Sequence, residues 1–433
     1  MKIQPVKGTR DFYPEDMAVH NYIVDGWKKV SLRNGFEEYD GPIFEYLKMF
    51  QIKSGDEIVE QLFSLTDRGG RDLALRPEMT PTLARMVNQR ISSLPRPIKW
   101  FSVPRLFRAE RPQKGRLREF FQWNIDIIGE ESVLADAEII FTTVDYLRQA
   151  GLTSEDIKVK ISSRRLLSAV LKKIGIEESA LDSLYVVLDK KTRLPPDTFS
   201  ALLKEQVGDK ERAEKIESFM SIESVSQIDE TISLEDNRAI REVAELNRML
   251  EQMGISEYCQ FDPSIVRGLA YYTGIVFEVH DVVGDLRAIC GGGRYDNLLA
   301  DFGGPTVSAT GMGMGDCVLE ILLKDKGLLQ KQVPKIQLDY FVASIGSGAL
   351  AERVYRIIAE LRSRGESANF SYKMGGLSRQ LKEASALNAK ECIIIGEEEL
   401  KENKITVKDM ATGEQELVDY DEFLSRLDPA QGT

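Results

Sequence analysis

A carboxylate and a hydroxyl stand two residues apart at Glu78 and Thr80. Here a short strand around Leu73 to Leu75 should give way to a helix that begins near Thr80. Polar side chains at such a junction suit a ligand site. The same spacing also arises when a threonine caps a helix beside an acid. The residues alone therefore leave a binding role and a structural role open.

A second group of candidate residues lies on an arginine-rich loop, 109–118, between two β-rich runs at 98–108 and 119–128. These runs predict a long antiparallel hairpin. Guanidinium groups match phosphate oxygens in fixed forks and stay protonated, so Arg108 at the end of the first run suits an anion held over a sheet. A solvated run of charge would have the same composition, and this alternative stays open.

The returning strand of the hairpin alternates between polar and apolar side chains. Successive residues of a strand point to opposite faces of the sheet. One face should therefore pack on a core, while the other presents amides and a carboxylate to a ligand. The apolar set is Trp123, Ile125 and Ile127, and the polar set is Gln122, Asn124 and Asp126.

A third group combines an arginine and two tyrosines, in Arg267 to Gly274, with a glycine-rich run, Gly291 to Asp296. Consecutive glycines let a ligand approach the backbone closely, although they also form plain turns. The tyrosines are equally compatible with a core position. Neither run has the GxGxxG or Walker A spacing, so a Rossmann or P-loop nucleotide site is unsupported.

Composition excludes several kinds of chemistry. The chain has two histidines and four separated cysteines, which argue against a structural zinc site, a metallohydrolase and Ser/His/Asp catalysis. Catalysis must instead depend on Arg, Glu, Asp, Gln and Tyr. The net charge of −12 argues against a surface coated in nucleic acid but permits a local basic patch. No signal peptide or membrane span is expected, and reduced cysteines indicate a cytoplasmic protein.

A chain of 433 residues predicts two or three domains. Helices are expected at 15–34, 134–150 and 164–173, followed by a helical insertion at about 176–255. A strand at 275–279 should lead to another that ends at Cys290 to Gly293, and Gly311 to Gly315 should open a helix that ends near 325. After a polar linker, alternating elements predict a mostly parallel sheet with packed helices. Its strands are expected at 338–343, 367–372 and 391–395, and its helices at 349–364 and 377–387.

These motifs resemble, in order and spacing, those of the class II aminoacyl-tRNA synthetases, and specifically the histidyl-tRNA synthetase family. The resemblance covers nearly the whole chain except 176–255. It is carried by the runs KGTRDFYP, RPEMT, FRAERPQKGRLREFFQ, VRGLAYYTG, GGGRYDNLL and ECIIIGEEEL.

The resemblance implies an α+β fold with a six- or seven-stranded antiparallel sheet flanked by helices. It implies a class II catalytic domain at 1–325 with the helical insertion, a linker at 326–335 and an anticodon-binding α/β domain at 336–433. It also implies a homodimer formed through the first long helix and the segment around Pro42. The expected activity is ligation of histidine to its tRNA with ATP, with Mg²⁺ accompanying the ATP and no metal site built from the protein.

The resemblance also assigns roles to individual residues. Arg108 and Arg267 are expected to be the catalytic arginines at the α-phosphate, with Glu110 and Arg116 as further ATP-binding residues. The acceptor end of tRNA is expected at Arg111, Gln113 and Arg118. The histidine site is expected to comprise Glu78 and Thr80 at the amino group, Gln122 at the carboxyl group, and Asp126, Tyr271, Tyr272 and Tyr295 around the imidazole.

Two positions depart from the family pattern. Ala270 stands where an acid is usual, and Val318 stands where an arginine usually stacks on adenine and touches the ATP phosphates. Either another cation takes that role, or ATP is held differently, or activation has been lost. Two alternatives to the enzyme follow: a regulatory subunit of ATP phosphoribosyltransferase and an inactive RNA-binding paralogue. The additional C-terminal domain favours the enzyme.

Overall fold

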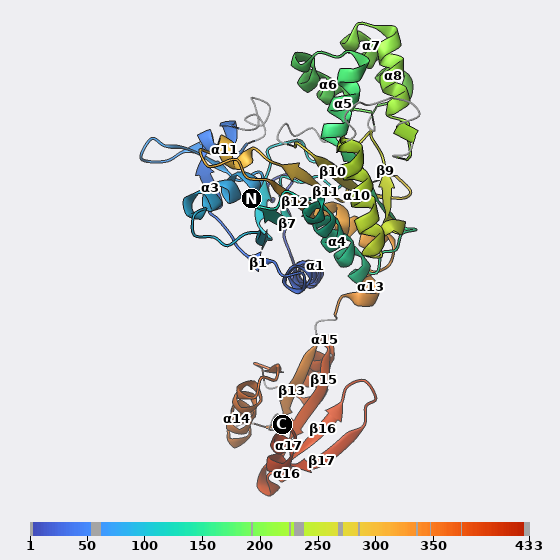
Figure 1. The fold of residues 1–433 in the computed structure, drawn as a ribbon. Helices are drawn as coiled ribbons and strands as arrows, with labels where there is room; N and C mark the ends of the chain where they lie inside the picture. The colour runs from blue at the N-terminus through green and yellow to red at the C-terminus, as the bar shows by residue number, and fades with distance from the viewer. Residues whose placement is uncertain are drawn as a thin grey trace. The chain divides into compact units, whose positions relative to one another are not determined.

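The computed structural model describes residues 3–52, 62–191, 194–224, 227–228, 238–266, 272–284, 286–334, 337–346, 348–373 and 375–427 (Figure 1). The chain divides into two compact units, Met1–Val333 and Pro334–Thr433. This division falls inside the segment where the linker was expected. However, α13 (Leu329–Gln332) lies in that segment as well, and its Leu329 is buried in the core of the first unit because it packs against apolar residues there.

The first unit is built on a nine-stranded sheet in the order β1-β5-β7-β12-β11-β10-β8-β9, with β6 also paired to β7. The interior pairs are antiparallel, whereas β1 and β9 join the two ends in parallel. The expected antiparallel sheet is therefore confirmed, and short edge strands make it larger than predicted. The strands are β1 (Glu37–Glu38), β5 (Ile98–Ser102), β6 (Arg105–Phe107), β7 (Glu119–Ile128), β8 (Ile157–Ser163), β9 (Cys259–Phe261), β10 (Ile275–Asp281), β11 (Cys290–Tyr295) and β12 (Ala309–Gly315).

The expected hairpin is present, but its first arm is divided into β5 and β6 around Pro104, which has no N–H to donate to a ladder. The alternation predicted for β7 is confirmed: Trp123, Ile125 and Ile127 lie in the helix-covered core, whereas the side chains of Gln122 and Asp126 lie against Gly313 and Gly311 on the other face. Trp123 stacks on Trp27 at 6.2 Å and donates a hydrogen bond from Nε1 to Ser31 Oγ at 2.8 Å.

Helices cover the apolar face of this sheet. The helices α1 (Pro14–Arg33), α4 (Val133–Gln149) and α12 (Asp316–Asp325) bury their apolar residues in one core with β7 and β12 (Figure 1). On the opposite face, α3 (Thr80–Arg90) and α11 (Leu298–Asp301) cover the end of the strands where Ile128 and Tyr295 lie. The rest of that face carries the polar residues of β7. None of the described helices is both long and apolar enough to cross a membrane.

The glycine-rich strands correct two predictions. Residues Gly311 to Gly315 do not open a helix but belong to the central strand β12, and α12 begins at Asp316. Glycines alternate with methionines here, so Met312 and Met314 enter the core while the glycines line the other face. Similarly, β11 does not end at Gly293 but runs from Cys290 to Tyr295 between two neighbouring strands.

Replacing Gly292 by alanine should destabilise the first unit by about 3 kcal/mol, since a methyl group forced into a close-packed interior displaces its neighbours. A Cβ at Gly292 would lie 2.1 Å from the backbone oxygen of Gly311. All three tryptophans of the chain lie in the first unit, so urea unfolding followed by tryptophan fluorescence measures this effect. The matched control is Gly315→Ala, because a Cβ at Gly315 has nothing within 4 Å. Equal stability losses in the two variants would contradict the prediction.

Helices follow β8: α5 matches the separate helix expected at 164–173, and the others lie in the segment 176–255, where a helical insertion was expected. These helices share one continuous core with the sheet, because α10 packs along α4 and also contacts α5 and β8 (Figure 1). The helices are α5 (Arg164–Ile174), α6 (Leu181–Leu188), α7 (Pro196–Val207), α8 (Lys210–Phe219) and α10 (Arg238–Gln252). A separate three-stranded sheet, in the order β2-β4-β3, lies between α1 and α3 in the sequence. Its strands are β2 (Phe44–Tyr46), β3 (Ser64–Thr66) and β4 (Asp72–Leu75).

The second unit contains a five-stranded sheet in the order β14-β13-β15-β16-β17. The first three strands are parallel, as predicted, while β16 and β17 add two antiparallel pairings. One face packs on α14 and α17, and the other packs on α15. The elements are β13 (Leu338–Ser344), α14 (Ala349–Ser363), β14 (Ala368–Phe370), α15 (Leu377–Ala386), β15 (Ala389–Ile395), α16 (Glu397–Glu402), β16 (Lys404–Asp409), β17 (Gln415–Asp419) and α17 (Tyr420–Leu427).

Candidate active site

The floor of the candidate site is the open face of β7, β12 and β11. In the antiparallel register Gly311 lies opposite Asp126, and Gly313 lies opposite Asn124 on one side and Gly291 on the other. Because directly opposed residues share a face, the polar side chains of β7 lie beside a strip of glycines. A Cβ at Gly311 would approach Asp126 Oδ1 to 2.1 Å. The glycines therefore leave room for the Asp126 carboxyl group and expose backbone beside it.

Asp126 and Tyr295 form a buried polar pair at one end of this floor. The Tyr295 hydroxyl donates a hydrogen bond to Asp126 Oδ1 at 2.5 Å, and the two residues are 3% and 6% exposed respectively. Burial raises the pKa of Asp126 to about 7, although the Tyr295 hydrogen bond opposes this shift. Tyr272 is also buried, and its ring lies 3.0 Å from where a Cβ at Gly293 would be. The three side chains thus gather at the glycine floor.

Glu78 and Arg108 lie close to one another where the hairpin meets the segment before α3. Arg108 Nε donates to the Pro77 carbonyl at 3.1 Å, and its guanidinium lies 5.1 Å from the centre of the Phe120 ring. Burial raises the pKa of Glu78, and the positive charge of Arg108 acts in the opposite direction. Thr80 is the first residue of α3. A carboxylate and a guanidinium are therefore both present here, and Gln122 lies on the same face of β7 as Phe120, which contacts Arg108.

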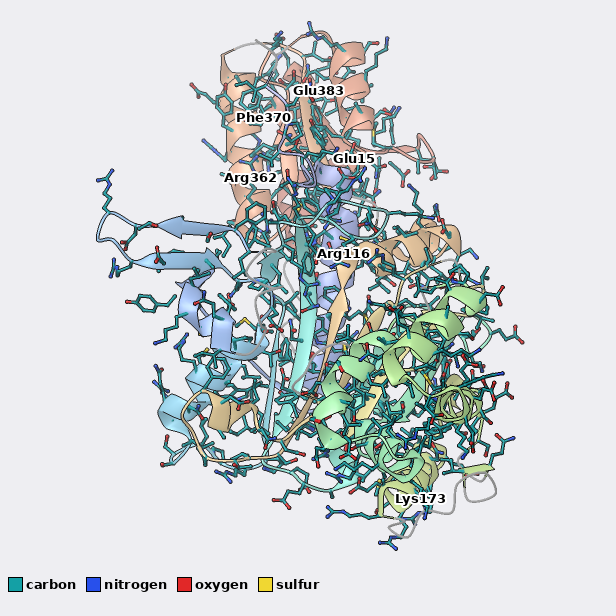
Figure 2. All side chains as sticks on the ribbon, turned by 90° about the horizontal axis from the view of Figure 1, so that it is seen from above. Glu15, Arg116, Lys173, Arg362, Phe370 and Glu383 are labelled. Carbon is teal, nitrogen blue, oxygen red and sulfur yellow. The ribbon has the colours of Figure 1, made fainter. Side chains whose placement is uncertain are left out.

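The loop 109–118 folds back on itself. Glu110 and Arg116 form an ion pair with each other, and backbone hydrogen bonds of 2.9 Å join Gln113 to Arg116 in both directions (Arg116 is labelled in Figure 2). Arg118 donates from its side chain to the Glu110 carbonyl at 3.1 Å, while Arg111 is exposed. Glu110 and Arg116, which were expected to bind ATP, thus share one loop with the three residues expected at the tRNA acceptor end.

Val318 lies against this loop. It is 8% exposed, and its Cγ2 is 2.9 Å from where a Cβ at Gly115 would be. A hydrophobic contact with the loop glycine therefore occupies the place where the resemblance implies an arginine. Another arginine, Arg287, reaches the loop from outside the motifs and donates from Nη2 to Gln113 Oε1 at 2.5 Å. Arg287 could not be identified from the sequence, because an isolated basic residue carries no local signal.

Two expected site residues, Arg267 and Tyr271, lie outside the described residues, as does Ala270, which departs from the family pattern. Phe120, whose ring faces Arg108, was not among the predicted site residues. Nor were the polar contacts of Arg294 and Asp296 on either side of Tyr295 predicted. Phe120 belongs to the quoted motif, and its even position on β7 could have placed it on the same face as Gln122. The contacts of Arg294 join residues too distant in sequence to be inferred from spacing.

Replacing Asp126 by asparagine should stabilise the first unit above neutral pH. The pKa of Asp126 rises from 3.8 to about 7 on folding, so the unfolded chain releases its proton at lower pH than the folded chain. As the pH rises from about 4 to about 7, the free energy of unfolding of the wild type should therefore fall relative to that of the variant. Above about pH 7 the difference between the two free energies should stay constant. One pKa unit corresponds to about 1.4 kcal/mol, so the full difference is at most about 4 kcal/mol.

Urea unfolding followed by tryptophan fluorescence at pH 5 and pH 8 measures this difference. Asp262→Asn is a control of opposite sign. Burial raises the pKa of Asp262, but the Ser264 hydrogen bond and Lys160 outweigh it and lower the pKa overall. That variant should be less stable than the wild type at pH 8. A stability difference between Asp126→Asn and the wild type that is the same at both pH values would contradict the prediction.

Comparison with known proteins identifies the family. A family model described as histidyl-tRNA synthetase matches residues 8–315, and one described as an anticodon binding domain matches residues 339–428. The chloroplastic/mitochondrial histidine–tRNA ligase of Arabidopsis thaliana is 40% identical over 419 residues, covering 95% of this chain and 84% of that protein. The histidine–tRNA ligase of Opitutus terrae is 37% identical over 415 residues, covering 94% of each.

The fold is shared with solved structures as well. The crystal structure of histidyl-tRNA synthetase from Nostoc sp. PCC 7120 matches with a TM-score of 0.82 at 23% identity, and the match covers 98% of this chain and 99% of that chain. The two family models follow each other along nearly the whole sequence, in the order of the two units. By its motifs, its glycine-floored antiparallel sheet and these relatives, the chain belongs to the histidyl-tRNA synthetase family.

Proposed function

We propose that the protein activates histidine with ATP to form histidyl-adenylate and pyrophosphate, and then transfers histidine to the 3′ end of its tRNA. The observation that carries this proposal is the buried Asp126–Tyr295 pair beside the glycine floor, with Arg108 at the other end of the same face. A carboxylate and a phenol can together satisfy both nitrogens of an imidazole ring. The relatives named histidine–tRNA ligase support the same activity.

The activation step joins two anions, since a carboxylate attacks the α-phosphate of ATP. Arg108 and Arg267 would neutralise this charge from two sides and align the reactants, which makes a general base unnecessary. Glu78 and Thr80 would hold the amino group of histidine, and Gln122 would hold its carboxyl end. Glu110 and Arg116, which pair with each other on the loop, would exchange that contact for ATP.

Magnesium would enter with ATP, because this ion usually keeps several waters and binds phosphates with one or two carboxylates. In the described residues no cluster of three or more His, Cys, Asp or Glu side chains could hold a metal ion by itself. Glu110 is a carboxylate of the proposed ATP site and suits such a shared contact. When bound, the ion would offset phosphate charge. The protein's own contribution would come from its arginines.

The tRNA would contact both units. The acceptor end would meet the loop through Arg111, Gln113 and Arg118, which follow Arg108 closely in the chain. The second unit matches an anticodon binding domain, where unpaired bases are recognised by their edges and by stacking. Its match also supports the ligase over a regulatory subunit without such a domain.

We further propose a cytoplasmic homodimer that uses α1 and the segment around Pro42. Large apolar side chains beside Pro42 support this surface: Ile43, Phe44 and Tyr46 are 49%, 55% and 56% exposed. The four cysteines are free, which suits a reducing compartment. Analytical ultracentrifugation tests the dimer, and a monomer at micromolar concentration would overturn it.

Histidine-dependent exchange of pyrophosphate into ATP tests the activation step, and charging of histidine tRNA tests the transfer step. We expect exchange with histidine and not with the other amino acids. Absence of exchange with every amino acid, together with retained tRNA binding, would show that the substitution at Val318 accompanies a loss of activation. Absence of both exchange and tRNA binding would favour the regulatory alternative.

A further inference from the structure

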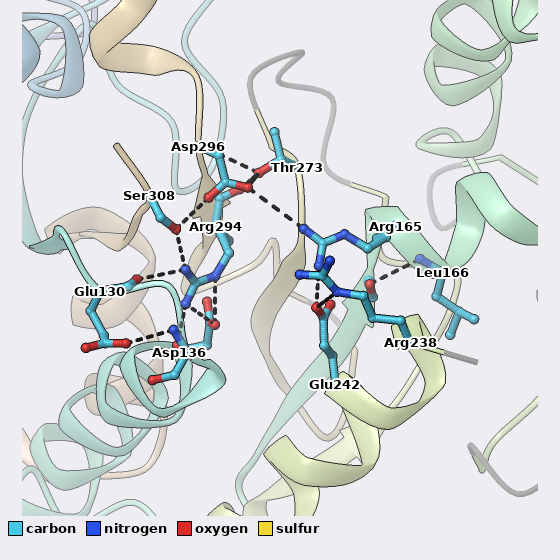
Figure 3. A network of polar contacts seen from close by, with 12 residues as sticks. Glu130, Asp136, Arg165, Leu166, Arg238, Glu242, Thr273, Arg294, Asp296 and Ser308 are labelled. Carbon is cyan, nitrogen blue, oxygen red and sulfur yellow. Dashed lines mark hydrogen bonds and ion pairs between the residues drawn. The ribbon is translucent and has the colours of Figure 1, made fainter. Parts of the chain in front are cut away.

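Arg294 and Asp296 stand on either side of Tyr295, and both are held by dense polar contacts (Figure 3). Arg294 is 5% exposed and points to the helix-covered face of the sheet, opposite to Tyr295. Its guanidinium binds Asp136 Oδ2 at 2.9 and 2.6 Å. It also donates to the carbonyls of Glu130 and Ser132 at 2.9 and 2.8 Å. The strand that carries Tyr295 is therefore fastened to the start of α4.

Asp296 joins Tyr295 to the segment that carries Tyr272. Its Oδ2 accepts a hydrogen bond from Thr273 Oγ1 at 2.7 Å, and its backbone N–H donates to the same hydroxyl at 3.2 Å. Thr273 also donates from its backbone to the Arg294 carbonyl at 2.9 Å. Three hydrogen bonds thus connect residues 272–274 with the end of β11, although the two segments are more than twenty positions apart.

A serine closes the network between the arginine and the aspartate. Ser308 donates to Asp296 Oδ1 at 2.6 Å, and Arg294 Nη1 donates to Ser308 Oγ at 2.5 Å (Figure 3). Ser308 immediately precedes β12, the glycine strand of the floor. Three segments beside the proposed imidazole pocket, namely the end of β11, residues 272–274 and the start of β12, are therefore joined behind it by charge-assisted hydrogen bonds, which are stronger than neutral ones.

The same aspartate faces the inserted helices. Arg165 on α5 lies 4.0 Å from Asp296 Oδ2 and also forms an ion pair with Glu242 on α10. A polar cavity of about 180 Å³ lies beside these groups and is lined in part by Arg165, Glu242 and Asp296. Asp296 therefore connects the residues behind the pocket with Arg165 and, through Arg165, with Glu242 on α10. The cavity also gives the carboxylate space for a water molecule, so loss of one hydroxyl partner should be tolerated by the fold.

We infer that Asp296, acting through Thr273, Ser308 and Arg294, is a positioning residue for histidine recognition. It fixes the two phenols of Tyr272 and Tyr295 relative to Asp126 without touching the substrate itself. The inference rests on the proposed function, because it assumes that these phenols surround the imidazole. A displacement of a reacting or binding group by about 1 Å can reduce activity by about a hundredfold, so a loosened network should weaken histidine binding.

The test removes one hydroxyl and keeps every charge. Thr273→Val should raise the KM for histidine in pyrophosphate exchange about tenfold, within the range that such small displacements produce. The KM for ATP should stay unchanged. Thr273→Ser keeps the hydroxyl and should restore the wild-type KM for histidine. The matched control is Thr143→Val on α4, where the buried hydroxyl donates only to the Ile139 carbonyl at 2.8 Å within its own helix, and this control should leave both KM values unchanged.

The outcomes separate this inference from the proposed function. If the wild type exchanges and Tyr295→Phe raises the KM for histidine while Thr273→Val does not, the positioning role is wrong and the pocket stands. If the wild type gives no histidine-dependent exchange, the proposed function fails first. If Thr273→Val lowers the unfolding midpoint and kcat but leaves both KM values unchanged, its role is structural and the inference is overturned.

Discussion

Replacing Arg108 by methionine is expected to lower the rate of histidine-dependent pyrophosphate exchange by about a thousandfold, as removal of one preorganised donor at a developing anion does. Arg108 stands at the end of the hairpin arm, held by the Pro77 carbonyl and placed over Phe120 on the open face. Methionine keeps much of the side-chain length and apolar packing but removes the charge. The expected loss is therefore mainly in kcat, with a smaller effect on the KM for histidine.

Arg105→Met is the control for this prediction. Arg105 lies three residues away on the same arm, but its guanidinium lies 4.7 Å from the centre of the Phe121 ring and pairs with Glu119. Phe121 follows Phe120 on β7 and points to the opposite face. The control should exchange at close to the wild-type rate, because its guanidinium contacts a ring on the other face of β7 from the proposed site. Equal losses in the two variants would show that general charge, rather than the position of Arg108, is what matters.

The parts of the site that could be predicted depend on local patterns. Alternation along β7 placed Asp126 and Trp123 on opposite faces, and the strand-breaking loop placed Arg108 at the end of a hairpin. Both follow from the two-residue period of a strand, which is a property of the neighbouring sequence. The first helix was likewise predicted within one residue at each end, since its apolar residues recur at helical spacing and Gly35 follows it.

The parts that could not be predicted depend on distant partners. Gly311 to Gly315 was expected to open a helix, yet pairing with β7 on one side and β11 on the other makes it a central strand. Arg294 binds Asp136 across 158 positions. No spacing rule connects such residues, because the contact exists only once the sheet and α4 have assembled. The missing arginine at Val318 could be recognised in the sequence, but its replacement by a contact with Gly115 could not.

Asp126→Asn is expected to raise the KM for histidine at least about a hundredfold. In a site built to hydrogen-bond its substrate, a mismatched buried polar group costs more binding free energy than the loss of a single contact. An amide presents an N–H where the imidazole or Tyr295 also donates. The KM for ATP should change little, since Asp126 lies at the opposite end of the floor from the arginine loop. Pyrophosphate exchange at saturating ATP and varied histidine measures the effect, and Asp262→Asn, at the far edge of the sheet, should leave the KM for histidine unchanged.

This loss of recognition should appear in the same variant that gains stability above neutral pH. Burial of Asp126 raises its pKa to about 7, so its charged form reduces the stability of the free protein. Folding stability therefore does not explain why an aspartate stands at this position. Tyr295 alone does not offset the cost of burying the Asp126 carboxylate. A bound imidazole would donate a second hydrogen bond to it. Residues that reduce stability but are needed at a site are a common form of trade-off. A variant that gains stability and keeps its KM for histidine would remove Asp126 from the pocket and would leave its burial without a functional explanation.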